Sequence, residues 1–290
     1  MALVQYSDSE SDSEQGAPPR KIIKQNKDGP GRKTASSLPP LPASFHDLYA
    51  SSTRVSVRDD PSLHGGRKRA IPHVEGNWPT HIYLEWYPAK EELIILNSII
   101  DQAGSCVRGE QAKLHSFLYS DLGAQLPLHI SLSRPVVLRT EERQPFMDAF
   151  EAFLENSDIS PFDVQVESLD WVSNFEKTRW FYVLRTKRPD EDSLNQLLHV
   201  SNSSLGLFGQ PPLYEAVSDA SKQDPKSAPK GDYTGCFHIS IAWSLEEPSD
   251  EDRNRERMER IDLGELAALR IRFDCVKAKI GNNVSSILLK

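Results

Sequence analysis

Hydrophobic and polar residues alternate in the same way over two short stretches, 129–133 and 238–243. The first reads His-Ile-Ser-Leu-Ser, and the second reads His-Ile-Ser-Ile-Ala-Trp. Successive side chains of a β-strand point to opposite faces, so the histidine and the serine two residues later share one face. The aliphatic residues between them then face a core. We therefore predict two strands, each presenting an imidazole and a hydroxyl on its polar face.

The same periodicities predict the other elements. Alternating or aromatic-rich runs predict strands at 81–86, 162–166, 178–186, 270–280 and 285–289. Apolar residues at helical spacing predict helices at 89–103, 111–119, 193–201 and 249–263, and one that opens at 140–143 and packs through Phe146, Phe150, Phe153 and Leu154. Two further segments lack such periodicity, and we predict a turn at 170–174 and a long loop at 206–235.

These elements form two similar sets, and each set contains one of the two histidine-serine strands. Helices mixed with hairpin-forming strands are typical of antiparallel sheets with helices packed outside. We therefore expect an α+β fold with two lobes, whose antiparallel sheets face a central cleft. A cleft between lobes is the natural place for a functional site.

The N-terminal part of the chain has a different composition. Residues 1–69 are rich in Ser, Pro, Gly and charge, with an acidic serine run at 7–14 and a proline-rich stretch at 38–42. Such a segment buries too little apolar surface to offset its chain entropy. We predict a disordered tail at 1–69 and one folded domain at 70–290, with the loop at about 206–235 as an insertion.

Charge and cysteine content narrow the class of protein. The formal net charge of -8 argues against polyanion binding by the whole surface, although it is compatible with a local basic groove. Cys106, Cys236 and Cys275 are widely spaced and predict neither a disulfide framework nor a zinc knuckle. No apolar run approaches the roughly 20 residues that span a bilayer, and the N-terminus is acidic. We expect a soluble intracellular protein without a membrane partner.

The two strands also carry the candidate chemistry. Two imidazoles and two hydroxyls, from His129, Ser131, His238 and Ser240, suit general acid-base catalysis on a phosphate ester. A metal site is disfavoured because few Asp or Cys residues lie at ligand spacing beside either motif, and the other histidines form no recognisable pair. A serine nucleophile is disfavoured because no glycine-bounded elbow surrounds either serine. One such strand alone is typical of the solvated face of a sheet. Two of them in one domain indicate a site.

These motifs resemble those of the two-histidine phosphoesterase superfamily. Within it, the chain is similar to the eukaryotic phosphodiesterases that trim the 3′ end of U6 small nuclear RNA. Further stretches match the sequence pattern of this family in the same order, at 66–69, 72–73, 76–81, 174–179 and 281–282. The likeness extends from about residue 66 to the C-terminus, and the acidic and proline-rich tail is similar too. The resemblance implies that residues 70–290 form the catalytic domain.

The resemblance implies a metal-independent 3′–5′ exoribonuclease without a cofactor. Its substrate would be the oligouridine 3′ end of U6 small nuclear RNA, in the nucleus, and the enzyme would act as a monomer. One histidine would take the proton of the attacking 2′-OH, and the other would protonate the departing 5′-oxygen, leaving a 2′,3′-cyclic phosphate. Ser131 and Ser240 would bind the non-bridging oxygens. The sequence does not decide which histidine is the base, or whether water later opens the cyclic phosphate to a 3′-phosphate.

Substrate binding involves further residues. In the family a tyrosine lies shortly before the second motif and stacks on a base. Here Tyr214 is separated from His238 by the insertion, and Tyr233 is the alternative. Lys177 and Arg179 are candidates for RNA phosphates, and Ser133 for the substrate face shared with Ser131.

Two other functions remain compatible with the sequence. One is a different two-histidine phosphoesterase, acting on cyclic nucleotides or tRNA-splicing products. The other is a non-catalytic RNA-binding protein.

Overall fold

The computed structural model describes residues 74–106, 114–174, 176–215, 231–248 and 264–290. The predicted tail at 1–69, the predicted helix at 249–263 and the centre of the 206–235 loop lie outside these residues. All of the described residues belong to one compact unit. None of the helices found there is long and apolar enough to cross a membrane.

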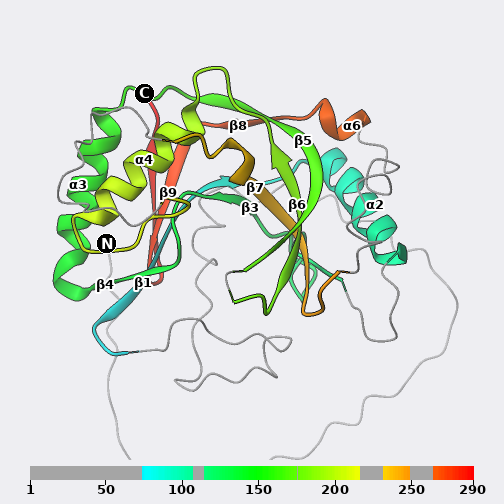
Figure 1. Ribbon diagram of the computed structural model, residues 1–290, viewed down its shortest axis with the longest axis horizontal. Coiled ribbons are helices and arrows are strands. Elements are labelled where there is room, and N and C mark those ends of the chain that lie inside the picture. Colours follow the sequence, from blue (N-terminus) through cyan, green and yellow to red (C-terminus); the bar gives the residue numbers. More distant parts are fainter. Residues whose placement is uncertain (1–73, 107–113, 175, 216–230, 249–263) are drawn as a thin grey trace, which may run out of the picture. The chain divides into compact units, whose positions relative to one another are not determined.

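The described strands join into one antiparallel sheet (Figure 1). They are β1 (Asn77–Trp86), β2 (His115–Ser116), β3 (Leu128–Ser131), β4 (Val136–Arg139), β5 (Phe162–Ser173), β6 (Trp180–Thr186), β7 (His238–Ser244), β8 (Arg270–Phe273), β9 (Cys275–Ile280) and β10 (Asn283–Leu288). The main order is β10-β9-β1-β3-β7-β6-β5-β8, with β4 pairing with β1 and β2 with β7. Every one of these pairs is antiparallel.

This order has two halves, β10-β9-β1-β3 and β7-β6-β5-β8. They meet where β3 pairs with β7, and each half contributes one of the histidine-serine strands. The predicted α+β class, with antiparallel pairing and two similar parts, is confirmed. The two parts are continuous through this central pair of strands.

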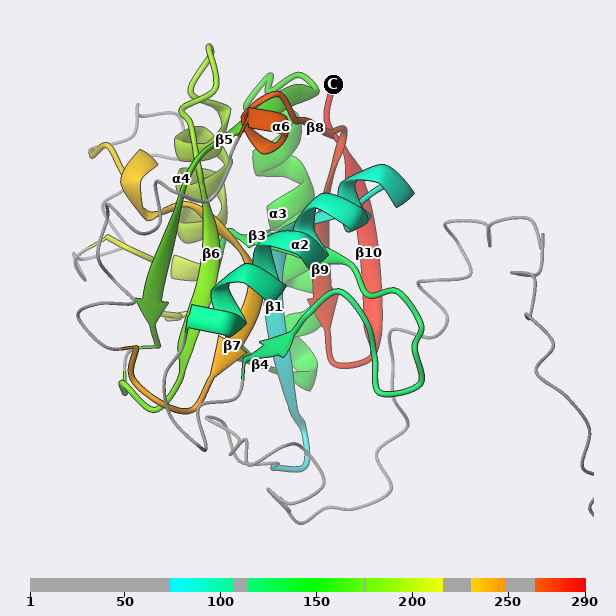
Figure 2. The same ribbon diagram turned by 90° about the vertical axis from the view of Figure 1, so that its right-hand side faces the viewer.

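The helices lie outside the strands, as the fold class predicts. They are α2 (Lys90–Cys106), α3 (Arg143–Glu155), α4 (Ser193–Gly206) and α6 (Gly264–Ala267), with 3-10 turns η2 (Thr140–Glu142) and η4 (Thr234–Cys236). Figures 1 and 2 show α2 on one side of the strands and the neighbouring α3 and α4 on the other. The predicted apolar face of α3 is confirmed at Phe146, Phe150 and Leu154, which are buried.

Alternation along β1 shows how the sheet is divided into a core face and a polar face. Ile82, Leu84 and Trp86 are buried, whereas His81 and Tyr83 between them keep partial exposure. Burying each large apolar side chain contributes about 1.5–3 kcal/mol, so this pattern strongly specifies which face turns inward. Because the apolar side chains of β1 must face the core, His81 and Tyr83 between them point to the opposite, polar face of the sheet.

The predicted helix at 111–119 is wrong in its described part. His115–Ser116 forms the short strand β2, and the ring of His115 stacks on Trp243 of β7 at a centroid distance of 4.2 Å. Residues 111–113 lie outside the described part. A short apolar run does not distinguish helix from strand by its periodicity alone, and here the cross-strand pairing decides.

The predicted turn at 170–174 is also wrong, because β5 continues to Ser173. Asp170 stays in the strand because it pairs with Val183 of β6, and its carboxylate also accepts hydrogen bonds from Arg185 of that strand. The chain turns after Ser173 instead, where the Asn174 side-chain oxygen accepts the backbone N–H groups of Thr178 and Arg179 at 2.8 and 3.1 Å. In addition, the single strand predicted at 270–280 is divided at Asp274 into β8 and β9.

Candidate active site

The pairing of β3 with β7 brings the four motif residues together. Ile130 lies opposite Ile239, and both side chains are completely buried. In an antiparallel pair the adjacent positions must then place His129 across from Ser240, and Ser131 across from His238. All four side chains point away from the buried isoleucines, so they share the accessible polar face. The structure therefore unites two imidazoles and two hydroxyls from segments about 100 residues apart.

The ring of His238 is oriented by a backbone carbonyl. Its Nδ1 lies 2.7 Å from the carbonyl oxygen of Cys236. A carbonyl oxygen only accepts, so Nδ1 carries the hydrogen and Nε2 is left for proton transfer in the neutral ring. The bond therefore selects the tautomer as well as the ring orientation.

Other side chains hold that carbonyl in place. The hydroxyl of Tyr214 donates to the Cys236 oxygen at 3.1 Å. Arg185 reaches the same oxygen at 3.5 Å and the Gly235 oxygen at 2.9 Å. The guanidinium is itself fixed by Asp170, whose carboxylate accepts its Nε and Nη2 at 2.9 and 2.6 Å. Three segments of the chain thus converge on the turn that precedes His238.

The structure places Tyr214 beside the second motif, despite the insertion in the sequence. Its ring meets Phe237 edge to face at 5.9 Å, and burial raises the pKa of its hydroxyl to about 12. The hydroxyl therefore remains a donor at neutral pH. The other candidate, Tyr233, is anchored by its backbone N–H to the side chain of Asn195 at 3.0 Å, and its ring lies over Gly231.

A third histidine, His81 of β1, also lies at the site. Its Nε2 is 3.2 Å from the Ser131 hydroxyl, and its ring meets that of His129 edge to face at 5.5 Å. Tyr83 stacks on the His81 ring at 5.1 Å. His81 is not among the site residues predicted from the sequence, because it forms no local pair with another histidine. The available signal was the alternation of β1, which puts His81 and Tyr83 on its polar face.

The three imidazoles have lowered pKa values. Burial among protein atoms, and secondarily the neighbouring His238, lower the pKa of His129 to about 4, although this side chain retains an accessible surface. Burial, His129 and Lys279 lower the pKa of His81 to about 3. Burial also lowers the pKa of His238, with the Cys236 carbonyl acting in the opposite direction. In the free protein all three rings are neutral at neutral pH, and a proton acceptor is already present.

Ser133 departs from the expectation that it faces the substrate. Strand β3 ends at Ser131, and Ser133 is 1% exposed. Its hydroxyl accepts the N–H of Ile82 and donates to the carbonyl of Arg134, both at 2.9 Å. The hydroxyl is thus used to join β1 to the end of β3.

Lys177 and Arg179 lie in the turn between β5 and β6, apart from the four motif residues. On β7, His238 pairs with Arg185, whereas Ser244 at the other end pairs with Trp180 beside this turn. The guanidinium of Arg179 lies over the Trp243 ring at 5.3 Å. Lys177 is exposed and lines a separate pocket.

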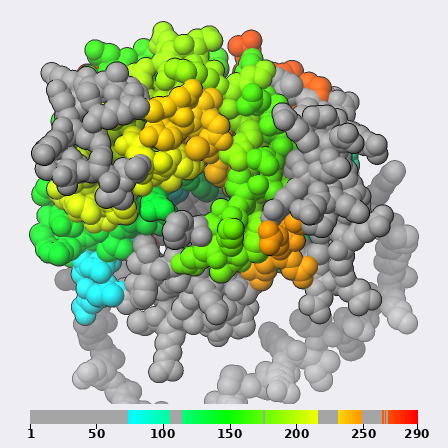
Figure 3. All heavy atoms as spheres, viewed as in Figure 1, coloured from blue at the N-terminus to red at the C-terminus, as the bar shows by residue number. Residues whose placement is uncertain are grey.

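The surface beside the site is hollowed. Figure 3 shows a depression between the yellow-orange residues that lead into β7 and the green residues of the β5–β6 hairpin. Within the described ranges, no group of three or more His, Cys, Asp or Glu residues is arranged to hold a metal ion.

The sequence of the chain is similar to those of known proteins. A family model named HVSL, described as an uncharacterised conserved protein, matches residues 39–288. The U6 snRNA phosphodiesterase 1 of Neurospora crassa is 34% identical over 289 residues, which cover 88% of this chain and 76% of that protein. The human protein of the same name is 29% identical over 305 residues, covering 99% and 98%.

The fold is similar to that of a solved structure, Kluyveromyces marxianus Usb1 with uridine monophosphate. The two superpose with a TM-score of 0.52 at 16% identity, over 73% of this chain and 98% of that one. At this identity the likeness concerns the fold.

Proposed function

Because the chain belongs to the U6 snRNA phosphodiesterase 1 family, we propose that its paired histidine-serine strands form the active site of an RNA phosphodiesterase that processes the 3′ end of U6 small nuclear RNA. The observation that carries the proposal is the register of β3 and β7, which gives each histidine a serine partner across the strands. A neutral imidazole can accept a proton from an RNA oxygen, and a protonated imidazole can donate one.

The chemistry follows from these groups and the substrate's own 2′-OH. One neutral imidazole removes the 2′-OH proton while that oxygen attacks the phosphorus. The other imidazole, which is protonated when the negatively charged phosphodiester is bound, gives its proton to the departing 5′-oxygen. The bond from phosphorus to the 5′-oxygen breaks, and a 2′,3′-cyclic phosphate remains. The Ser131 and Ser240 hydroxyls donate to the non-bridging oxygens, where negative charge develops. No step requires a metal ion.

The partner in this proposal is the single-stranded, uridine-rich 3′ end of the RNA, and the site of action is the nucleus, with the protein acting as a monomer. The Usb1 structure with uridine monophosphate supports a uridine nucleotide as ligand of this fold. Tyr214 or Tyr233 supplies the stacking ring. Of the two, Tyr214 has the stronger support, because its hydroxyl is bonded to the carbonyl that holds His238.

Single substitutions test the proposal. His129→Ala and His238→Ala are each expected to lower 3′-end trimming of an oligouridine RNA by more than about a hundredfold, with an unchanged unfolding temperature. EDTA is expected to leave the wild-type rate intact. The measurement is mass analysis of the 3′ ends, which also distinguishes a cyclic phosphate from a 3′-phosphate.

The same assay separates the alternative functions. Faster turnover of a cyclic mononucleotide than of the RNA would indicate a different phosphoesterase. RNA that binds without becoming shorter would indicate a binding protein. Loss of trimming on chelation would contradict the metal-free mechanism.

A further inference from the structure

The three strands that carry the site histidines are flanked by two strands that carry cations. In the sheet order β9-β1-β3-β7-β6, the outer two are β9 and β6. On β9, Lys279 lies opposite His81. On β6, Arg185 lies opposite His238. Residues directly opposite one another in an antiparallel pair share a face of the sheet, so both cations lie on the polar face, at opposite sides of the motif residues.

Carboxylates already neutralise two cations of this face. The carboxylate of Asp170 accepts a hydrogen bond from Nη2 of Arg185 at 2.6 Å. Lys277 of β9 lies opposite Tyr83 and therefore also points to the polar face. Its ammonium is 3.5 Å from the carboxylate of Glu85, and the two side chains are only 11% and 12% exposed. Each of these two cations is thus balanced within the protein.

Lys279 lacks such a balance. Its neighbours across the strands are His81 on β1 and Val284 on β10, neither of which is anionic. Within the described ranges, no carboxylate forms an ion pair with its ammonium. The side chain is half-buried, and after burial and His129 its charge is a further cause that lowers the pKa of His81. The ammonium therefore acts on the site as an uncompensated positive charge.

The position of Lys279 matches a phosphate beside the reacting one. Ser131, which is assigned to the non-bridging oxygens, is hydrogen-bonded to His81, the residue opposite Lys279. Strand β9 lies two strand spacings, about 10 Å, from β3. A lysine side chain bridges part of this distance, so we expect its ammonium to reach the neighbouring phosphate. Tyr214, assigned to a base, lies beside the turn before β7, on the other side of the motif residues.

An ammonium at this place suits the charge of the substrate. The site imidazoles are neutral in the free protein, whereas every linkage of RNA carries a negative charge. A lysine ammonium binds phosphate as a point charge. Contacts of this kind supply much of the affinity of proteins for nucleic acids, whatever the bases are.

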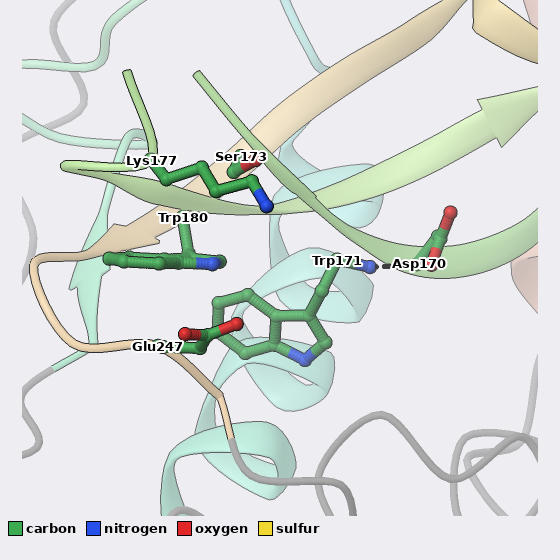
Figure 4. Close-up of a pocket in the computed structure, with 6 residues that line it drawn as sticks. All are labelled: Asp170, Trp171, Ser173, Lys177, Trp180 and Glu247. Carbon is green, nitrogen blue, oxygen red and sulfur yellow. Dashed lines mark hydrogen bonds between the residues drawn. The ribbon is translucent and has the colours of Figure 1, made fainter. Parts of the chain in front are cut away.

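The other lysine considered for RNA phosphates lies at a pocket on the opposite face of the sheet. Figure 4 shows Lys177 at this pocket together with the indole of Trp171. Trp171 follows Asp170 directly and pairs with the buried Tyr182, so it points to the core face. Lys177 is therefore not directed toward the motif residues, and it does not replace Lys279.

We propose that Lys279 binds the RNA phosphate immediately upstream of the one that reacts. When the last nucleotide of a 3′-hydroxyl end is trimmed, this is the only phosphate adjacent to the reacting one. The inference rests on the proposed function and deepens it, because it assigns a residue that holds the RNA backbone while the 3′ end occupies the site. The contact makes the enzyme sensitive to the charge of one particular linkage.

The first test changes the charge of the RNA. Two oligouridines of about eight nucleotides are compared, one with phosphate at every linkage and one with a neutral methylphosphonate at the linkage before the last. Both lack the 2′-OH that would attack this linkage, so it is stable. In wild type the neutral linkage is expected to lower kcat/KM for removal of the last nucleotide by roughly tenfold.

The second test changes the charge of the protein. Lys279→Met is expected to lower kcat/KM on the all-phosphate RNA by roughly tenfold and to cleave the two RNAs equally well. Lys279→Arg retains the charge and is expected to keep most of the rate and of the sensitivity to the neutral linkage. Lys90→Met, which removes an exposed lysine from the start of α2, is the matched control and is expected to behave as wild type.

The outcomes distinguish failure of the contact from failure of the function. If wild type does not shorten the all-phosphate RNA, the proposed function fails. If it shortens both RNAs equally well, the assignment of Lys279 alone is overturned, and this comparison needs no variant. A Lys279→Met enzyme that stays as sensitive to the neutral linkage as wild type would also overturn the assignment.

Binding measured at several salt concentrations checks the contact without turnover. In a His129→Ala background, the logarithm of Kd for the labelled all-phosphate RNA is plotted against the logarithm of the salt concentration. Each phosphate contact of a single strand adds about 0.7 to the slope, so Lys279→Met is expected to lower the slope by about 0.7. Lys90→Met is expected to leave it unchanged. Equal slopes for Lys279→Met and its parent would contradict the contact.

Discussion

The side chains around His129 and His238 determine which of their ring nitrogen atoms carry a hydrogen and which protonation states are available. The Cys236 carbonyl holds the hydrogen of His238 on Nδ1, and burial keeps the His129 imidazole neutral. His81 contributes indirectly to the orientation of the Ser131 hydroxyl, because its Nε2 is hydrogen-bonded to that hydroxyl. With a pKa lowered to about 3, this ring is neutral at working pH and adds no positive charge beside His129.

We predict that His81 is a positioning residue that acts through Ser131. His81→Ala is expected to lower kcat by roughly tenfold with little change in KM, because the serine hydroxyl loses its preferred orientation toward the phosphate. His81→Asn, which retains a hydrogen-bonding side chain, is expected to recover most of this loss. Steady-state kinetics on oligouridine measure both effects.

A double variant gives the control for this assignment. If His81 acts through Ser131, then His81→Ala adds little to the loss caused by Ser131→Ala. Losses that multiply in the double variant, or an Asn variant as slow as Ala, would show that His81 has a different role.

Strands β5, β6 and β7 are connected by side chains as well as by their backbone ladder. Arg185 of β6 binds Asp170 of β5 and the carbonyl groups that lead into β7. Its side chain is 20% exposed, so these bonds are partly shielded from water. The arginine therefore sets the position of the turn that carries His238.

Removal of this connection is expected to affect both stability and rate. Arg185→Met is predicted to lower the free energy of unfolding by about 1–3 kcal/mol, because several hydrogen bonds to a charged group are lost. It is also predicted to lower kcat, since His238 loses part of its support. Urea denaturation and trimming kinetics are the measurements.

Arg272 supplies a matched control on a neighbouring strand pair. Its ion pair with Asp163 spans 3.5 Å and both side chains are well exposed. Arg272→Met is therefore expected to change the free energy of unfolding by less than about 1 kcal/mol and to leave kcat unchanged. Equal effects of the two substitutions would contradict the role given to Arg185.

The curved antiparallel sheet as a whole creates the environment that lowers the histidine pKa values. The pKa of His129 is about 4, and that of His238 lies below the ordinary value of 6.5. A general base must be neutral, so kcat/KM rises as pH increases through its pKa. A general acid must be protonated, so kcat/KM falls above its pKa.

We therefore predict that the pH profile of kcat/KM is a bell centred below pH 6.5. The profile of kcat is expected to lie at higher pH, because the negative charge of the bound phosphodiester stabilises an imidazolium and raises its pKa. Buffers of constant ionic strength are needed for both profiles. A kcat/KM maximum above neutral pH would be inconsistent with this environment.

Local patterns along the chain were sufficient to predict many of the elements and one face of the site. The alternation at 129–133 and 238–243 predicted which side chains point away from the core, and this is confirmed for His129, Ser131, His238 and Ser240. Such prediction works because the two-residue period of a strand is a property of neighbouring residues. The alternation failed at Ser133, where the strand had already ended.

Contacts between segments that are distant in the sequence could not be predicted from these local patterns. The register that sets Ile130 opposite Ile239, the bond from His81 to Ser131 and the path from Asp170 through Arg185 to Cys236 join different strands. Strand pairing depends on how all apolar faces pack at once, and no short stretch contains that information. The sequence by itself therefore determined which residue types supply the chemistry. The hydrogen-bond partners of these residues, their protonation states and their positions relative to one another were decided only by the tertiary structure, because they depend on how the strands pair and pack.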